Sequence, residues 1–404
     1  MGIYSSSQQC KVIKILKSLS ANGTPGFGAA NMIDIGSTDF LHFFEKEILD
    51  DFIEKGGSTC RFFEGVNGAG KTHLLQLIED LALKKGYLIC NIELTKDIDF
   101  SRPQIITKQI LEHCFANING ELIKGYPNII EKAGDEIIIE TKSFKDIQLP
   151  HACLQNAIGY ALERSSLDDE AWNLIYRYLL GEKILVRDLQ KNQLKGIKKP
   201  LTEKNSEQFL QTALNVIRHL GFKGFILLYD ETEKSWQSNR NPTPKKVQNA
   251  ANVIRRFIDA CSMGDIRGTL AIFAVLPGFI EDCSTCYPAL GQRINIQKNS
   301  SENSAWRWPF LSVDAVNSLT DINLDYSVQK ENFYSAAKKK FTELVDFCDG
   351  DIKGIEDDFD KVAINELNKC SNEEYRRMLI KTLSTVADGR IKIECAETVE
   401  SFRR

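Results

Sequence analysis

The stretch Gly65-Val-Asn-Gly-Ala-Gly-Lys-Thr72 decides the fold, because it fits the phosphate-loop pattern G-x-x-x-x-G-K-[ST] without a mismatch. The preceding residues 59–64 are apolar enough for a short strand, and residues 73–84 place apolar positions on one helical face. A strand, a glycine loop and a helix in this order are the context in which the pattern carries meaning. The competing interpretation is a chance glycine turn before an ordinary helix, and eight fitting positions argue against it.

Each residue type in this stretch suits phosphate binding. Glycines let backbone N–H groups close around phosphate oxygens, and the positive end of the following helix points at the same phosphates. Lys71 is expected to reach the β- and γ-phosphates, and the Thr72 hydroxyl is expected to bind Mg²⁺. The predicted ligands are therefore ATP and Mg²⁺. The loop residues predicted to bind the nucleotide are Gly65, Asn67, Gly68, Ala69, Gly70, Lys71, Thr72 and His73.

A second part of the predicted site lies at the end of the apolar run 225–229, which reads as a strand buried on both faces. Hydrolysis needs an acid to hold Mg²⁺ and a base to orient water, and both are expected at the carboxyl end of such a strand. Asp230 is the predicted metal ligand and Glu231 the predicted catalytic base, with Glu233 a weaker candidate. The alternative is an exposed acidic turn after a core strand.

Two later segments supply candidate arginines. Arg293 follows the predicted strand 269–276 and is assigned to the γ-phosphate, in cis or from a neighbouring subunit. The competing interpretation is a surface or structural arginine. Arg376 and Arg377, on a predicted late helix, are candidates for a second sensor, and Arg377 is the one assigned to nucleotide binding. The strand tip Val275-Leu-Pro277 has no polar side chain, so no γ-phosphate sensor is predicted there.

The order of predicted elements indicates an α/β fold with a parallel sheet, because a helix lies between the predicted strands 59–64 and 86–94. Region 120–205 is charged and mostly helical, and we interpret it as a helical insertion. Residues 40–55 and 103–116 also read as helices and residues 32–35 as a possible short strand, and strand 269–276 is expected beside the Asp230 strand. Three predicted helices over 333–387 form a small helical domain. The predicted divisions are an N-terminal helical segment 1–57, a P-loop ATPase core 58–300 and a C-terminal helical domain 301–404.

Residues 183–204 of the insertion are rich in lysine and have little apolar periodicity, which suggests a mobile part. Charge runs of this kind are usually solvated surface, and that is the first interpretation. The second is contact with the phosphate backbone of DNA, independent of base sequence. The lysines that would make this contact are Lys191, Lys195, Lys198, Lys199 and Lys204.

The composition limits the class of protein. With 404 residues, 43 % hydrophobic and 26 % charged, the chain is typical of a globular protein of two or three domains. A net charge of −4 gives no overall attraction to nucleic acid. Eleven irregularly spaced cysteines favour reduced thiols in a cytoplasmic protein, and the lone Cys283-Ser-Thr-Cys286 lacks the second pair that zinc needs. No apolar run approaches the length of a membrane span, so no membrane contact is expected.

The chain resembles the ATP-binding proteins of bacteriophage-exclusion (BREX) systems, the BrxD-like P-loop ATPases, which belong to the AAA+ group near its origin-recognition-like branch. The similarity spans nearly the whole chain in the same order. It implies an AAA+-like core, a role in prokaryotic defence against phage and a protein partner such as a helicase. A homo-oligomer, and contact with DNA directly or through the partner, are compatible with this resemblance. Family members tend to carry a threonine before the proline that is Pro277 here, and this chain has Leu276 in that place. They also tend to carry an arginine after the glycine that is Gly36 here, and this chain has Ser37. The segments that carry the resemblance are 11–19 with the following loop 23–26, the turn 35–36, and 61–73, 81–87, 227–233, 276–281, 287–294 and 375–383.

Three functions are compatible with these residues. The first is Mg²⁺-dependent ATP hydrolysis that drives a conformational cycle in a defence complex, and Glu231 favours it. The second is a nucleotide-gated binding module with little hydrolysis, which the apolar tip at Leu276 favours. The third is an ABC- or SMC-like ATPase, but that class needs an L-S-G-G-Q signature before the acidic strand, and the stretch before 225 has none.

Overall fold

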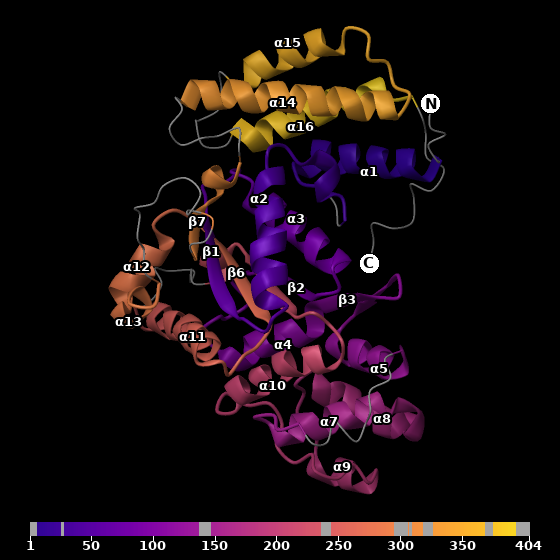
Figure 1. The fold of residues 1–404 in the computed structure, drawn as a ribbon, viewed down its shortest axis with the longest axis vertical. Coiled ribbons are helices and arrows are strands. Elements are labelled where there is room, and N and C mark those ends of the chain that lie inside the picture. The colour runs from indigo at the N-terminus through magenta and orange to yellow at the C-terminus, as the bar shows by residue number, and fades with distance from the viewer. Residues whose placement is uncertain are drawn as a thin grey trace. The chain divides into compact units, whose positions relative to one another are not determined.

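The computed structural model describes residues 6–25, 28–136, 147–235, 244–294, 306, 309–317, 326–367 and 375–392 (Figure 1). The chain forms two compact units, each of which is built from segments distant in sequence. The predicted division into three consecutive parts stays a prediction. We call the two units the helical unit, with Met1–His42, Gly65–Asp80 and Ser312–Arg404, and the sheet unit, with Phe43–Glu64 and Leu81–Leu311.

The sheet has seven strands in the order β4-β3-β2-β5-β6-β1-β7. Its central strands β2, β5, β6 and β1 pair in parallel, which confirms the predicted α/β fold with a mostly parallel sheet. Strands β3 and β4 add an antiparallel hairpin at one edge. The strands are β1 Thr59–Glu64, β2 Leu88–Glu93, β3 Cys114–Ile118, β4 Glu121–Lys124, β5 Phe225–Asp230, β6 Thr269–Val275 and β7 Phe310–Ser312.

The central strands are buried, and aromatic side chains pack across them. Every residue of β5 and β6 is buried, as expected for strands that contain the apolar runs 225–229 and 270–275. The rings of Phe62, Phe273 and Tyr229 stack across β1, β6 and β5, with centroids 5.4 and 4.7 Å apart. Because Glu64 pairs with Val275, and Tyr229 with Phe273, strands β1 and β5 end at one edge with β6 between them. The predicted place of strand 269–276 beside the Asp230 strand is confirmed.

The hairpin β3–β4 corrects part of the prediction for region 103–125. The predicted helix 103–116 ends at His113, because the following residues pair with β2 and extend the sheet. Asn119 and Gly120 form the turn, with φ of +52° and +89°. Such an Asn-Gly pair favours a two-residue hairpin turn, and this local signal marks the hairpin in the sequence.

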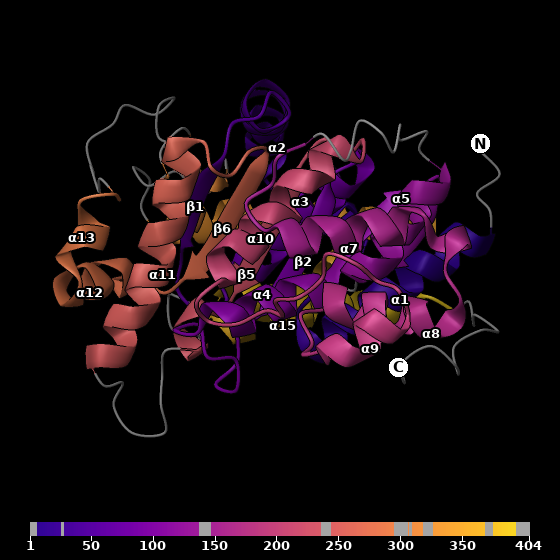
Figure 2. The same ribbon diagram turned by 90° about the horizontal axis from the view of Figure 1, so that it is seen from below.

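Helices surround this sheet. Helix α11 packs beside β1 and contacts both α12 and α13, and α10 packs on α4 (Figure 2). The predicted helix over 40–55 is helical but continues α2 as a π-helix, η2. The helices of the sheet unit are η2 Phe44–Ile53, α4 Pro103–His113, α5 Tyr126–Glu136, α7 Ala152–Leu162, η3 Arg164–Ser166, α8 Asp169–Leu179, α9 Val186–Lys191, α10 Ser206–His219, η4 Thr232–Ser235, α11 Pro244–Met263, α12 Phe279–Cys286 and α13 Pro288–Gly291.

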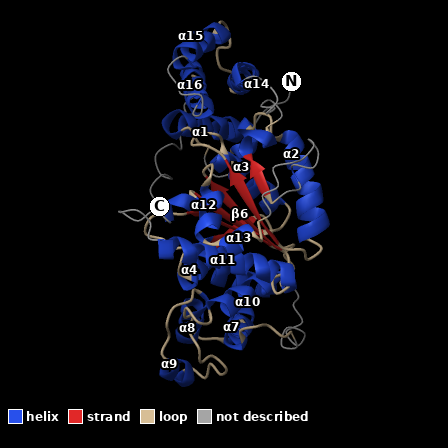
Figure 3. Ribbon diagram, turned by 90° about the vertical axis from the view of Figure 1, so that its left-hand side faces the viewer, coloured by secondary structure: helices blue, strands red, loops and turns tan. Residues whose placement is uncertain are grey.

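The helical unit is a bundle in which α1, α14 and α15 all pack on α16 (Figures 1 and 3). Its core includes Leu16, Phe341 and Leu383, none of which is exposed. The three predicted C-terminal helices are confirmed, but the predicted strand at 32–35 is wrong, because η1 occupies 30–33. The elements are α1 Ser6–Asn22, η1 Ala30–Ile33, α2 Thr38–Phe43, η6 Val313–Val316, α14 Tyr326–Phe347, α15 Ile355–Leu367 and α16 Tyr375–Arg390. Helix α3, Lys71–Lys84, begins in this unit.

Two global expectations can be compared with the part of the chain that is described. None of its helices combines the length and apolar character that crossing a bilayer requires. The expectation of reduced thiols is wrong at Cys10, which is disulfide-bonded. The free thiols are Cys60, Cys90, Cys114, Cys153, Cys261, Cys283, Cys286 and Cys348.

Candidate functional site

The glycine loop connects the end of β1 to the first residue of α3. Gly68 and Gly70 have φ of +81° and +101°, a region that favours glycine. A Cβ on Gly65 would lie 3.2 Å from the Cβ of Ala69 and 3.4 Å from the Cγ of Lys71, so the loop is too tight there for a side chain. Asn67 is exposed at the crest. The predicted sequence of strand, loop and helix is confirmed, and its glycines stand where the backbone needs them.

Lys71 lies over this loop and is 7 % exposed. Its Nζ donates hydrogen bonds to the carbonyl oxygens of Gly65 at 2.6 Å and Val66 at 3.1 Å. Thr72 follows in the first turn of α3 and is partly buried. The loop therefore contains one ammonium group at its centre, held by the loop's own backbone.

His73, the next residue of α3, has a buried Nδ1 with no hydrogen-bond partner. Burial lowers the pKa of its imidazole to about 4, and the nearby Asp34 carboxylate opposes that shift only in part. The side chain is therefore neutral at pH 7 and adds no charge to the loop.

We expect His73 to make stability depend on pH. Its folded pKa of about 4 lies below the ordinary value of 6.5, so the unfolded chain takes up a proton that the folded chain does not. The contribution of the neutral His73 side chain to the free energy of unfolding is complete above pH 6.5. It is lost as the pH falls toward 4, by up to about 3 kcal/mol. As the pH is lowered from 6.5 to 4, the melting temperature should fall less steeply for His73→Gln than for the wild type. The exposed His42→Gln serves as control, and equal slopes for all three proteins would refute the assignment.

Arg376 connects α16 to the glycine loop. Its Nη1 donates to the carbonyl oxygen of Ala69 at 2.9 Å, and its Nη2 donates to Oδ1 of Asp314 at 2.7 Å. The guanidinium also lies 5.7 Å from the ring centroids of Phe333 and Tyr375. Since the residue is 8 % exposed, these contacts form a buried support behind the loop.

Arg377, the residue assigned to nucleotide binding, lies elsewhere. Its Nη2 donates to the carbonyl oxygen of Asn22 at 3.1 Å, and its side chain packs against Gly23. The helical spacing of α16 explains the difference, because Arg376 shares the buried face with Leu379 and Leu383 and Arg377 does not. The same spacing is legible in the sequence and would have selected Arg376.

Replacing Arg376 by methionine should loosen the loop, because the buried carbonyl of Ala69 and the half-exposed Asp314 would lose their common donor. We expect a loss of about 1–3 kcal/mol of stability and a weaker ATP affinity. Arg377→Met, one position along the same helix, is the matched control. It should change neither the stability nor the ATP affinity by more than a small fraction. Thermal melting and ATP titration of both variants check this. Equal behaviour of the two variants would contradict the support role of Arg376.

The acidic end of β5 belongs to the sheet unit. Asp230 is 7 % exposed, and its Oδ1 accepts a hydrogen bond from the backbone N–H of Glu231 at 2.9 Å. Glu231 has a φ of +54°, so the chain turns sharply as it leaves the strand. The Glu231 carboxylate lies 3.3 Å from Nζ of Lys234, which is also 3.7 Å from Glu93. Lys234, which the sequence interpretation missed, therefore orients the predicted base.

Arg293 lies beyond α13 and is paired within its own unit. Its Nε donates to Oδ1 of Asp259 at 3.0 Å, and Asp259 also accepts from Nη1 of Arg255 at 2.7 Å. The Arg293 side chain remains 38 % exposed. A partly exposed arginine on one shared carboxylate can exchange partners at modest cost.

The candidate residues form one group in each unit. The glycine loop begins directly after Glu64, and Glu64 and Asp230 end parallel strands at the same edge. Within the sheet unit, Asp230, Glu231 and Lys234 form one group. Within the helical unit, the loop, Lys71 and Arg376 form another.

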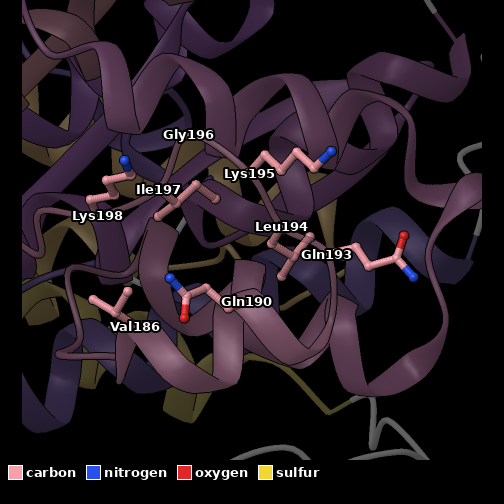
Figure 4. A pocket seen from close by; sticks show the side chains of 8 residues that line it. All are labelled: Val186, Gln190, Gln193, Leu194, Lys195, Gly196, Ile197 and Lys198. Carbon is pink, nitrogen blue, oxygen red and sulfur yellow. The ribbon is translucent and has the colours of Figure 1, made fainter.

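The lysine-rich segment is better packed than its sequence suggested. Four aliphatic side chains, Ile184, Leu189, Leu194 and Ile197, are buried in the core of the sheet unit. The Tyr160 hydroxyl contacts the backbone of Lys195, and the Tyr178 hydroxyl donates to the carbonyl of Lys199. The side chains of Lys191, Lys195, Lys198, Lys199 and Lys204 are exposed. A cavity of about 350 Å³ lies within this segment (Figure 4).

Comparison with known proteins gives one finding. A family model described as BREX system ATP-binding protein BrxC/D matches residues 8–122 and 107–318. These ranges include the glycine loop, the acidic end of β5 and Arg293. No curated protein and no solved structure matches the chain.

Proposed function

Because this chain belongs to the BREX system ATP-binding protein BrxC/D family, whose model matches most of its length, we propose that it is a Mg²⁺-dependent ATPase of a phage-defence complex. ATP binding and a place in a BREX system are inferred from membership of this family. Hydrolysis is our inference. The observation that supports it best is the tight glycine loop with Lys71 buried at its centre.

Phosphate binding is assigned to the loop. Its backbone N–H groups and the N-terminus of α3 would face the phosphate oxygens. The Lys71 ammonium now donates to the carbonyls of Gly65 and Val66, and phosphate oxygens would replace these acceptors. Gly65, Asn67, Gly68, Ala69, Gly70, Thr72 and His73 complete the proposed nucleotide site.

Mg²⁺ is assigned to the Thr72 hydroxyl and the Asp230 carboxylate, which are the hard oxygen donors that this cation prefers. When bound, Mg²⁺ would neutralise charge on the phosphate oxygens. No group of three or more His, Cys, Asp or Glu forms a metal site in the described ranges. That agrees with Mg²⁺, which is commonly held by one or two protein ligands together with phosphates and water.

Glu231 is assigned the role of base. Its carboxylate would accept a proton from the attacking water, and Lys234 would hold the carboxylate in one orientation. The chain leaves the strand that Asp230 ends through a left-handed turn at Glu231, with φ of +54°. The two neighbouring acids would thus have separate tasks.

Arg293 is proposed to act on the nucleotide of a neighbouring subunit, after leaving Asp259. An arginine finger raises turnover by about 10³–10⁵-fold in other NTPases. Neither Arg293→Ala nor Lys71→Ala protein should then hydrolyse ATP alone, but a mixture should recover part of the activity. In that mixture an intact loop from one variant can meet an intact finger from the other. If mixed oligomers form without recovery, Arg293 acts in cis or has no catalytic role.

A nucleotide-gated binding module is the second candidate. Strand β6 ends at Val275 and is followed by Leu276, so its tip offers no polar group to a γ-phosphate. The pairing of Glu231 with Lys234 would also restrain the base until a partner binds. In this version ATP binding, rather than turnover, would recruit a helicase or another defence component, and DNA would be contacted directly or through that partner.

The ATPase rate of the purified chain distinguishes the two candidates. It should be measured with Mg²⁺, alone and with single- or double-stranded DNA, together with the mass in solution. Turnover that depends on Mg²⁺ supports the ATPase. ATP binding without turnover under all of these conditions supports the gated module, and no ATP binding would refute both.

A further inference from the structure

A group of exposed acids surrounds an exposed isoleucine at the turn between α14 and α15. We call residues 346–357 the acidic tip, which carries five acids and one lysine, a net charge of −4. Ile352 at its centre is 44 % exposed, between Asp351 and Lys353. Hydrogen bonds fix the turn, since Asp349 accepts from Gln9 at 2.8 Å and Asp351 accepts the backbone N–H of Lys353 at 3.0 Å.

The lysine-rich segment 183–204 has the opposite charge and an apolar cavity. It contains seven basic and two acidic residues, a net charge of +5. Its cavity of about 350 Å³ has an aliphatic floor in Leu194 and Ile197. Leu185 and Val186, beside the cavity, are 48 % and 40 % exposed, which is unusual for adjacent aliphatic residues. The residues that line this basic pocket are Val186, Gln190, Gln193, Leu194, Lys195, Gly196, Ile197 and Lys198 (Figure 4).

We propose that the acidic tip of one copy docks into the basic pocket of a second copy. Ile352 would enter the cavity, and the surrounding carboxylates would pair with Lys195 and Lys198. The two surfaces are different, so the contact is heterologous and would extend into a ring or a filament. This assembly does not depend on ATP hydrolysis.

The pocket suits a protein segment better than DNA. A phosphate backbone has no aliphatic side chain to cover Val186, which is 40 % exposed beside the buried Leu194 and Ile197, whereas an isoleucine supplies one. Lys195 and Lys198 extend to opposite sides of the cavity, so both can reach carboxylates around one inserted side chain (Figure 4). Charge complementarity supports the second copy as occupant, because one chain carries both the −4 tip and the +5 segment.

The test uses charge reversal on the full-length chain, with mass measured by sedimentation. Lys195→Glu/Lys198→Glu reverses the pocket, and Asp346→Lys/Asp357→Lys reverses the tip. Each variant alone should associate at least about tenfold more weakly than wild type, since the net charge falls from +5 to +1 in the lysine-rich segment or from −4 to 0 in the acidic tip, and most of the attraction is lost. Ile352→Asp should weaken association in the same way. A matched control is Lys84→Glu/Lys339→Glu, which makes the same change in charge at exposed lysines elsewhere.

Mixing the two reversed proteins decides the proposal. In the mixture the unaltered −4 tip of one protein can meet the unaltered +5 segment of the other, so pairwise association between the two proteins should return to near the wild-type level. Association of the wild type should also weaken as salt rises from about 50 to about 500 mM. Wild type that stays a single copy, reversed variants that keep the wild-type mass, or a mixture without recovery would each overturn it. A pocket variant that loses duplex DNA binding at unchanged mass would also overturn it, and would assign the lysines to DNA.

Discussion

Replacing Lys71 by alanine is expected to abolish ATP binding. The Lys71 ammonium is the cation at the centre of the glycine loop, and its two backbone acceptors mark where phosphate oxygens would compete for it. Losing a charge-assisted contact to phosphate should weaken binding at least about 100-fold, which corresponds to about 2.8 kcal/mol. Calorimetric titration with ATP and Mg²⁺ measures the change.

A matched control comes from the other end of the same helix. Lys84 is exposed and ends α3, so Lys84→Ala removes the same charge without touching the loop and should bind ATP as wild type does. Lys71→Met keeps most of the aliphatic stem and should fail like Lys71→Ala, which separates charge from packing. If Lys71→Met binds ATP normally, the loop does not hold the phosphates through Lys71.

Glu231→Gln should keep ATP binding and lose turnover. Glutamine has the shape of glutamate and can remain at the φ of +54°, but it cannot accept a proton from water. General-base catalysis typically contributes about 10²–10⁴-fold in rate, so a loss of that size is expected with ATP affinity unchanged. Steady-state turnover and ATP titration on the same preparation measure both quantities.

The control for this variant is Glu93→Gln. Glu93 is the other carboxylate near Lys234, at 3.7 Å, and it lies at the end of β2. Its loss removes a negative charge from the same lysine without touching the proposed base, so turnover should remain near the wild-type rate. Turnover of Glu231→Gln equal to wild type would exclude Glu231 as the base, and equal losses in both variants would point to Lys234 instead.

Local patterns predicted the centre of the fold. Strand β1, the glycine loop and α3 follow one another in sequence, so the residues around Lys71 specify them together. The central strands β5 and β6 were equally legible, because unbroken apolar runs of this length are typical of strands covered on both faces. The Asn119-Gly120 turn shows that a local signal can also be present and still be overlooked.

Contacts between distant residues could not be predicted in the same way. The support of Ala69 by Arg376 joins positions 307 residues apart, and only the packing of α16 brings them together. The apolar residues at 32–35 resembled a strand, but a strand needs a neighbour, and η1 forms there instead. Pairing of Glu231 with Lys234 depends on the sharp turn at Glu231, which no propensity indicates.

The discontinuity of the helical unit has a consequence for how the protein is made. The apolar face of α1, with Leu16 and Leu19, is completed by Leu379 and Leu383 of α16. At about 5–20 residues per second, a ribosome needs roughly 20 to 70 seconds to pass from the first helix to the last. The nascent chain therefore lacks the α16 side of this core until synthesis is nearly complete. Because Arg376 lies in the same late helix, the glycine loop acquires its support only near the end of translation.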